Sequence, residues 1–267
     1  MEIREMITEI KGRLDTRGGL KAVIFVACGG SQAAIYPGKY LLEREANEIA
    51  VSIYNSNEFN YVTPKSLDER CIVICCSLKA TAETVHAVER ARQFGAVTIA
   101  MTGSPETGMA KAGEYVVVYS NGDEQIYSQS NQSMALRLGF EILHQFEGYP
   151  LYHEAMAAFD QIDAIVAESK RSMLPAAQSF AVEYQNDPLF QVLGAGPLYG
   201  TAYSMANCHF MEMHWRNAIM IHSGEYFHGP FEMTSETQPM ILLMATGRSR
   251  FLDAMPDEDT LKIFDIN

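Results

Sequence analysis

The stretch KAVIFVACGGSQAA, residues 21–34, joins a short apolar run to a glycine-rich turn and then to a helical pattern. Strand, turn and helix in this order form the repeating step of a parallel sheet, because the chain must cross back over the sheet before the next strand begins. Four more apolar runs of strand length follow, with helical segments between them. They are residues 46–54, 70–77, 96–103 and 114–120. These patterns predict a five-stranded parallel sheet with helices on both faces.

The second half of the chain begins the same pattern again. FQVLGAG at residues 190–196 predicts a strand and a glycine-rich turn, and TAYSMANCHFMEMHW at 201–215 predicts the helix that follows. The turn in LGAGPLYGTA mirrors the turn in VACGGSQAA, which indicates two copies of one α/β unit. Strands at 217–223, 239–247 and 260–266 complete the second copy, with a short helix over EYFHGPFEM. Because this copy has fewer elements, we expect it to be abbreviated or truncated at its C-terminus.

The predicted fold class is α/β, with two parallel-sheet, flavodoxin-like α/β/α sandwich units joined by a helical middle. We expect a first domain at residues 1–150, which includes an N-terminal helix. A helical connector is expected at 151–188, and a second domain, incomplete at its C-terminus, at 189–267. The chain has 267 residues and is 48% hydrophobic, which is sufficient to bury two cores.

The composition restricts the partners and the cellular location. A formal net charge of −13 argues against nucleic acid or an anionic membrane surface as a partner, since both would be repelled at long range. No segment approaches the roughly 18 consecutive apolar residues of a membrane span, and the N-terminus has acids where a signal peptide needs positive charge. We therefore expect a cytoplasmic protein. Its five cysteines lack zinc-ligand spacing and are expected to be reduced. His209 and His214 are five residues apart and not four, and no H-E-x-x-H motif is present, so no metal site is predicted, and no cofactor is expected.

The turn after the first strand has the features of an anion site. Gly29 and Gly30 let the backbone approach a ligand, and Ser31 offers a hydroxyl at the expected N-cap of the next helix. Backbone N–H groups at a helix start are unpaired and lie at the positive end of the helix dipole. A plain tight turn with a capping serine is the alternative interpretation.

The third strand also ends in hydroxyl groups. Ser77 closes this strand, Thr81 opens the next helix, and Lys79 lies between them as a point charge. In a parallel sheet, both turns lie at the same edge. The sequence GGSQAA does not match G-x-G-x-x-G, and no acid ends the second strand, so a dinucleotide is disfavoured. Two hydroxyl-lined turns side by side fit one phosphate monoester better.

Further motifs extend this pattern along the chain: CGGS after a strand, the CSLKATAET turn, and FMEMHW followed by HSGEYFHGPFE. Together with the duplicated unit, they resemble the sugar isomerase (SIS) family of phosphosugar-binding proteins, and within it the fructoselysine-6-phosphate deglycases. The resemblance implies that the substrate phosphate lies at Ser31, Ser77 and Thr81. Against the family pattern S-x-S-G-x-T, Cys76 replaces the first serine, Lys79 replaces the glycine, and the second serine is missing. Backbone N–H groups and Lys79 are therefore expected to carry more of the phosphate binding.

The same resemblance implies which groups move protons. In the family's isomerases, a glutamate lies sixteen residues before the histidine of H-G-P, and Glu212 lies sixteen residues before His228. The resemblance makes Glu212 the base that moves a proton between C1 and C2 of an open-chain sugar. It makes His228 the group that opens the ring or serves the leaving side. The family often supplies this histidine from the neighbouring subunit, which implies a homodimer, or a higher oligomer, with a shared active site.

The conversion of a phosphorylated ketoamine also requires a base and an acid, independently of the family resemblance. Conversion of a ketoamine into an aldimine needs a base for a C1 proton and an acid for O2, which suit a carboxylate in a partly apolar pocket and an imidazole. Glu225, three residues before His228, is expected to hold that imidazole or to receive a substrate hydroxyl. The alternatives are a solvated helix acid for Glu212 and a turn histidine fixed by Gly229-Pro230 for His228.

These expectations lead to three functional hypotheses. The first is an enzyme that splits a phosphorylated Amadori compound, such as fructoselysine 6-phosphate, into glucose 6-phosphate and lysine. The second is an aldose–ketose isomerase of the glucosamine or fructose 6-phosphate type. The third is a non-catalytic module that senses a phosphosugar. The presence of both Glu212 and His228, and the lack of a basic N-terminal domain, favour an enzyme.

Overall fold

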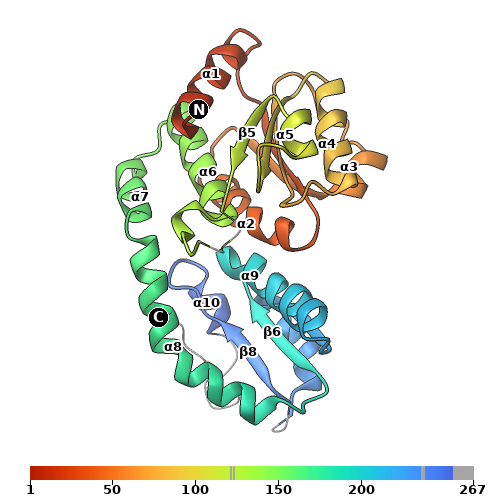
Figure 1. Ribbon diagram of the computed structural model, residues 1–267, viewed down its shortest axis with the longest axis vertical. Coiled ribbons are helices and arrows are strands. Elements are labelled where there is room, and N and C mark those ends of the chain that lie inside the picture. The colour runs from red at the N-terminus through yellow and green to blue at the C-terminus, as the bar shows by residue number, and fades with distance from the viewer. Residues whose placement is uncertain (121, 123, 236–237, 255–267) are drawn as a thin grey trace. The chain divides into compact units, whose positions relative to one another are not determined.

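A computed structural model describes residues 1–120, 122, 124–235 and 238–254 of the chain. The chain divides into two compact units, Met1–Val166 and Ala167–Asn267. The division falls within helix α8 (Ile162–Tyr184), which follows α7 (Tyr152–Phe159) (Figure 1). Both helices begin inside the region that the sequence assigns to the connector.

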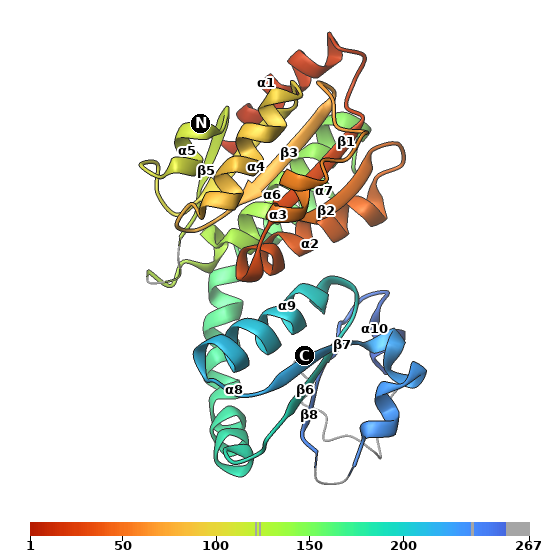
Figure 2. The ribbon, with the colours of Figure 1, turned by 90° about the vertical axis from the view of Figure 1, so that its right-hand side faces the viewer.

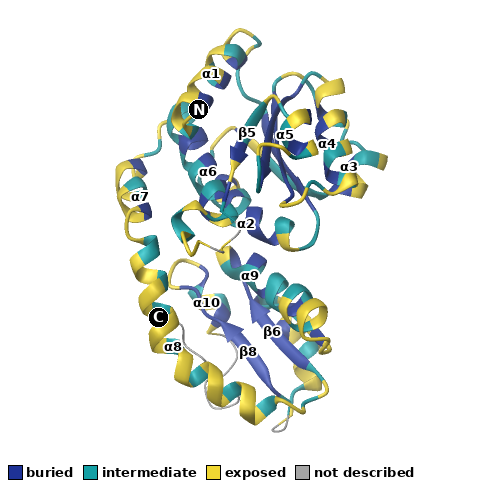
Figure 3. Cartoon of the chain, in the orientation of Figure 1, coloured by how far each residue is buried: buried dark blue, intermediate teal, exposed yellow. Residues whose placement is uncertain are grey.

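The first unit contains a five-stranded parallel sheet with the strand order β2-β1-β3-β4-β5 (Figures 1 and 2). Its strands are β1 (Ala22–Ala27), β2 (Ala50–Asn55), β3 (Cys71–Cys76), β4 (Val97–Thr102) and β5 (Tyr115–Val118). The three central strands are buried along their whole length, because helices cover both faces of the sheet (Figure 3). The predicted parallel sheet is confirmed.

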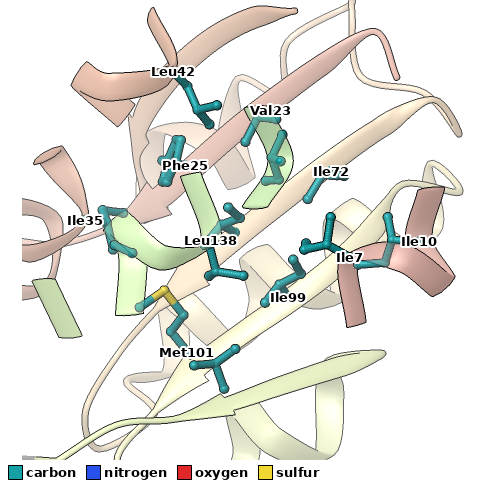
Figure 4. Packing of buried hydrophobic residues seen from close by; sticks show 14 of the residues in the cluster. Ile7, Ile10, Val23, Phe25, Ile35, Leu42, Ile72, Ile99, Met101 and Leu138 are labelled. Carbon is teal, nitrogen blue, oxygen red and sulfur yellow. The ribbon is translucent and has the colours of Figure 1, made fainter. Parts of the chain in front are cut away.

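Helices pack on the two faces in separate groups. Along β1, Val23 and Phe25 point into one core, which α1, α2 and α6 cover (Figure 4). Ile24 and Val26 point into the other core, which α3, α4 and α5 cover. The helices of this unit are α1 (Ile3–Asp15), α2 (Gly29–Glu45), α3 (Ser56–Tyr61), α4 (Ala82–Gln93), α5 (Gly108–Ala112) and α6 (Asn131–Glu147), with a short η1 (Tyr127–Gln129). A Cβ atom at Gly38 would lie 2.6 Å from the carbonyl oxygen of Ala135, so α2 and α6 approach each other at a position that admits only glycine.

The second unit contains a three-stranded parallel sheet with the order β7-β6-β8 among its described residues. The strands are β6 (Phe190–Gly194), β7 (Ala218–His222) and β8 (Met240–Leu243). Gly194, at the end of β6, pairs with His222 and with Leu243, so the C-terminal ends of all three strands share one edge. The strand predicted at 260–266 lies outside the described residues.

Two helical predictions in this unit differ in detail from the structure. The helix predicted at 201–215 begins as η2 (Gly196–Leu198) and α9 (Tyr199–Tyr203) and continues as a π-helix, η3 (Ser204–Met213). The short helix over EYFHGPFEM is two 3₁₀ segments, η4 (Ser223–His228) and η5 (Pro230–Met233). Gly229, with φ of 140°, separates them because this backbone conformation is accessible to glycine and not to bulkier residues. A last helix, α10 (Arg250–Asp253), follows β8.

Candidate active site

The turn between β1 and α2 presents free backbone donors to a ligand. Cys28 is the N-cap of α2, and Gly29 is the first helical residue, with φ of 55°. The first hydrogen bond of the helix runs from the N–H of Gln32 to the carbonyl of Cys28, so the N–H groups of residues 29–31 have no partner within the helix. The first turn of α2 also carries no acidic residue, which leaves its positive dipole uncompensated. This helix start is therefore suited to a phosphate group.

The prediction that Ser31 is the N-cap of α2 is wrong. The N-cap is Cys28, because the helix begins with Gly29, the residue with positive φ, and Ser31 lies in the first helical turn. Its backbone N–H is still one of the free donors, and its hydroxyl lies beside the side chains of Cys76 and Tyr119. Ser31 can thus serve a phosphate with both groups.

Two neutral side chains support Ser31 from the core. The Sγ atom of Cys76 lies 3.8 Å from the phenolic oxygen of Tyr119, and both residues are buried. Burial raises the pKa of the Cys76 thiol to about 12, although contacts with Tyr119 and Ser31 lower it in part. Burial and the nearby Cys76 also raise the pKa of Tyr119. Cys76 is therefore a neutral thiol behind the turn, in contact with Ser31 and Tyr119.

The turn between β3 and α4 is held by a chain of hydroxyl groups. The N–H of Thr81 donates to the Oγ of Ser77 at 3.0 Å, which makes Ser77 the residue that shapes this turn. The Oγ1 of Thr81 then lies 3.1 Å from that of Thr84, and Thr84 lies 2.9 Å from the Oγ of Ser56 on α3. Ser77, Thr84 and Ser56 are buried, while Thr81 and Lys79 are exposed. Thr81 and Lys79 are thus the side chains of this turn that can reach a ligand.

The two turns differ in charge. β1 and β3 are neighbours, with Ala27 opposite Cys76, so both turns lie at the C-terminal edge of the sheet as predicted. The first turn of α4 contains Glu83, which opposes an anion, whereas that of α2 has no acid. The start of α2 is therefore the stronger anion site of the two.

The equivalent turn of the second unit has lost its donors. Gly196 follows β6 by two residues and has φ of 53°, which matches the position and conformation of Gly29 after β1. The next residue is Pro197, which has no N–H, and Leu198 takes the place of Ser31. The backbone of the duplicated unit is kept while its anion-binding groups are absent, so phosphate binding is expected in the first unit alone.

The structure places Glu212 and His228 at opposite edges of the second sheet. The helix α9–η3 runs antiparallel to β6, because Ala202 packs against Gly194 at one end while the rings of Phe210 and Phe190 stack at the other, 4.5 Å apart. Glu212, two residues after Phe210, therefore lies near the N-terminal edge. His228 lies on η4, which begins directly after β7 at the C-terminal edge. A five-residue strand spans about 16 Å, so one chain does not bring the two groups together.

Glu225 and His228 lie on the same element. They are three residues apart on the 3₁₀ helix η4, and side chains with this spacing lie on the same side of such a helix. Between them, Tyr226 is buried and its hydroxyl lies 2.7 Å from the Oγ1 of Thr234. Tyr226 therefore anchors η4, and both Glu225 and His228 are exposed.

The expected apolar pocket around Glu212 is not present in the single chain. Glu212 is exposed at the end of η3, as are its neighbours Met211, Met213 and Trp215, with exposed fractions of 39%, 67% and 89%. η3 is a π-helix whose hydrogen bonds run over five residues, as from His214 to His209, and Glu212 lies near its C-terminal end.

Exposed apolar residues also flank His228 along the chain. They are Phe227, Phe231 and Met233, each more than a third exposed. Each of the two predicted proton carriers thus has exposed apolar neighbours along the chain, which is typical of surfaces that another chain covers.

Among the residues that the structure describes, no group of three or more His, Cys, Asp or Glu side chains could hold a metal ion. No helix within residues 1–254, apart from the four positions not described there, is long and apolar enough to cross a membrane.

The five-stranded sheet and the turn between β1 and α2 lie in the part of the chain that matches a known protein family. A family model described as the SIS domain matches residues 20–141, which cover this sheet and turn. The chain is 36% identical over 253 residues to the fructosamine deglycase FrlB of Bacillus subtilis (strain 168), a match that covers 94% of this chain and 76% of FrlB. The chain belongs to the SIS-domain family that includes this deglycase.

Other relatives agree with this assignment. The fructoselysine 6-phosphate deglycase of Escherichia coli (strain K12) is 26% identical over 230 residues, which are 85% of this chain and 66% of that protein. A crystal structure assigned as a phosphosugar isomerase from Salmonella typhimurium LT2 has a TM-score of 0.89 and 39% identity, covering 94% of this chain and 76% of that chain. These relatives place the chain among phosphosugar deglycases and isomerases.

Proposed function

We propose that the protein is a deglycase that cleaves a phosphorylated Amadori compound, such as fructoselysine 6-phosphate, into glucose 6-phosphate and lysine. The observation that carries the proposal is the 36% identity to a fructosamine deglycase along 94% of the chain. The free donors at the start of α2 support it, because they provide a place for the phosphate of such a substrate.

In the proposed reaction, the substrate binds with its phosphate on Ser31 and the backbone of Gly29 and Gly30. His228 donates to the ring oxygen and opens the sugar, with Glu225 orienting the imidazole. Glu212 removes a proton from C1, which carries the amine, and O2 is protonated as an enaminol forms. Protonation of C2 gives the aldimine, and one water molecule hydrolyses it to the aldehyde of glucose 6-phosphate and the free amine.

We infer that this site is shared between two copies of the chain in a homodimer. Glu212 and His228 lie at opposite edges of one sheet, so a substrate that contacts both needs them from different chains. The exposed apolar residues beside each group, Met213 and Trp215 on one side and Phe227 and Phe231 on the other, support a covered surface at both places. Closure by the partner would also desolvate Glu212, which raises the basicity of a carboxylate.

An isomerase is the second candidate. The chain is 28% identical over 232 residues to the isomerizing glutamine–fructose-6-phosphate aminotransferase of Symbiobacterium thermophilum, a match that covers 84% of this chain and 37% of that enzyme. Proton transfer between C1 and C2 is common to both reactions, so Glu212 and His228 would serve either one.

Incubation with fructoselysine 6-phosphate and, separately, with fructose 6-phosphate tests the proposal. Enzyme-coupled detection of glucose 6-phosphate should show rapid release from the first substrate, with one lysine per sugar. The variant Glu212→Gln should slow this release by about 10²–10⁴, while Glu89→Gln, a change of an exposed acid on α4, should leave the rate unchanged. Release from fructose 6-phosphate alone would make the protein an isomerase, and turnover of neither would refute both.

A further inference from the structure

A buried carboxylate ties together the ends of two strands in the second unit. Asp253, on α10, is completely buried. Its Oδ1 accepts a hydrogen bond from the Oγ of Ser223 at 2.7 Å, and its Oδ2 accepts one from the N–H of Ala245 at 3.0 Å. Ser223 follows β7 directly and Ala245 lies two residues after β8. The carboxylate therefore joins the C-terminal ends of two strands that are not neighbours in the sheet.

The residue that Asp253 holds is the first residue of η4. The following turn is fixed from two more directions, because the N–H of Gly224 donates to Nδ1 of His222 at 3.0 Å and Leu252 packs against Gly224. A Cβ atom at Gly224 would lie 3.2 Å from that imidazole nitrogen, so the turn closes tightly on His222. The start of η4 is thus fixed by its own strand and by α10.

Stability alone does not account for a carboxylate at this position. Burial of a charged group costs free energy that its partners offset only when the geometry is favourable, and apolar replacements of buried ionic groups are often neutral or stabilising. The carboxylate of Asp253 instead provides a fixed geometry, because its two hydrogen bonds set the position of Ser223 relative to the end of β8. From Ser223, Glu225 is two residues away and His228 five, both on η4.

We propose that Asp253 is a positioning residue that sets the orientation of η4, and with it Glu225 and His228, for the reaction. Asp253 does not touch the substrate, because it is completely buried, and it acts through the hydroxyl of Ser223. The proposal rests on the proposed function, in which Glu225 and His228 are the groups that η4 presents. It adds a residue outside the motif Ser223–Glu232 to the machinery of the site.

The test compares Asp253→Ala and Ser223→Ala with Asp253→Asn. The first two remove the bond to η4, whereas the carboxamide of asparagine can still accept from Ala245 and donate to Ser223. Glu141→Ala is the matched control, because Glu141 is also a buried carboxylate, bonded to Tyr152 and to Gln145, in the first unit. We expect kcat for fructoselysine 6-phosphate to fall about 10- to 100-fold in the two alanine variants, since misplacement of a reacting group by about 1 Å costs this much.

Three further measurements separate positioning from loss of fold. The KM and the rise in Tm with glucose 6-phosphate should stay near wild type, because the phosphate binds in the first unit, and Asp253→Asn should recover most of kcat. The control should lose Tm and keep kcat. Normal kcat in both Asp253→Ala and Ser223→Ala would overturn the proposal, as would a kcat loss in the control as large as theirs. If Asp253→Ala does not fold, Ser223→Ala decides.

The positioning role and the proposed function can fail separately. If the wild-type protein turns over neither sugar, the proposed function fails, and NMR of the His228 imidazole then tests positioning. A shifted or broadened His228 signal in Ser223→Ala, with the signal of His86 on α4 unchanged, supports the proposal. An unchanged His228 signal contradicts it.

Discussion

Removal of the Thr84 hydroxyl tests how the β3–α4 turn is built. Thr84 is 1% exposed, and its Oγ1 lies 2.9 Å from the Oγ of Ser56 and 3.1 Å from the Oγ1 of Thr81. Thr84→Val keeps the shape of the side chain and removes both bonds, which leaves the fully buried hydroxyl of Ser56 without this partner. A lost bond with an unsatisfied buried group costs about 1–3 kcal/mol, which corresponds to a fall in Tm of several degrees.

The variant should also bind phosphosugar more weakly, because the Thr81 hydroxyl loses its bond to Thr84 and is held less firmly at the ligand edge. The assay is thermal denaturation with and without glucose 6-phosphate. Thr98→Val is the control: its hydroxyl is also buried and accepts a bond at 3.0 Å from the N–H of Glu114, but it lies near the start of β4, away from the turn. The control should lose Tm and keep its full rise with ligand. An unchanged rise with ligand in Thr84→Val would refute this account of the turn.

Three other outcomes are expected. Glu212→Gln should leave Tm almost unchanged and lower kcat by about 10²–10⁴, the usual contribution of a positioned general base, and normal turnover would remove Glu212 from the mechanism. Burial raises the pKa of Glu147, but hydrogen bonds from the N–H groups of residues 47–49 outweigh it, so the net pKa is lowered. Wild type should therefore exceed Glu147→Gln in stability by about 1–3 kcal/mol at neutral pH, and urea titrations should show the difference disappearing as the pH falls through the lowered pKa. Iodoacetamide should modify half-buried Cys28 before buried Cys76, and glucose 6-phosphate should slow the reaction of Cys28 beside the anion turn; equal rates with and without ligand would argue against binding there.

The fold was predictable from the sequence because its signals are local. Each central strand is a continuous run of buried apolar residues, as in β1 and β3, and such runs are typical of a sheet covered on both faces. The glycine turn after β1 was also predictable, because glycine readily adopts the positive φ that Gly29 has, whereas anion binding at this turn stays a prediction. The exact N-cap was not predictable, because serine is a favoured N-cap residue and the sequence does not show that the helix already begins at Gly29, with positive φ, after Cys28.

Other features depend on tertiary contacts that no local pattern reveals. Ser56 and Thr84 are ordinary polar residues in the sequence, and only the packing of α3 on α4 makes them a buried pair that supports Thr81. The π-helix η3 was missed because a five-residue hydrogen-bond pattern leaves no mark in an apolar periodicity. Asp253 was missed because a single acid near the end of the described chain carries no motif.

The separation of Glu212 from His228 could have been predicted from the order of strands and helices, although not from their spacing of sixteen residues. A helix that follows one parallel strand must return along the sheet, so residues at its end lie at the edge opposite to the turn after the next strand. Glu212 ends such a helix and His228 follows such a strand. The spacing of sixteen residues therefore identifies two groups of the proposed site, but it does not mean that they lie close together in one chain.

The most direct test of the shared site is complementation between two inactive variants. Glu212→Gln and His228→Asn are purified separately, mixed in equal amounts, and allowed to exchange subunits under mild denaturation. If each site takes Glu212 from one chain and His228 from the other, half of the dimers are mixed and each has one intact site of two, so about a quarter of wild-type deglycase activity should return. If mixing restores no activity although mass spectrometry shows mixed dimers, both groups act from the same chain, and the account of the site is wrong.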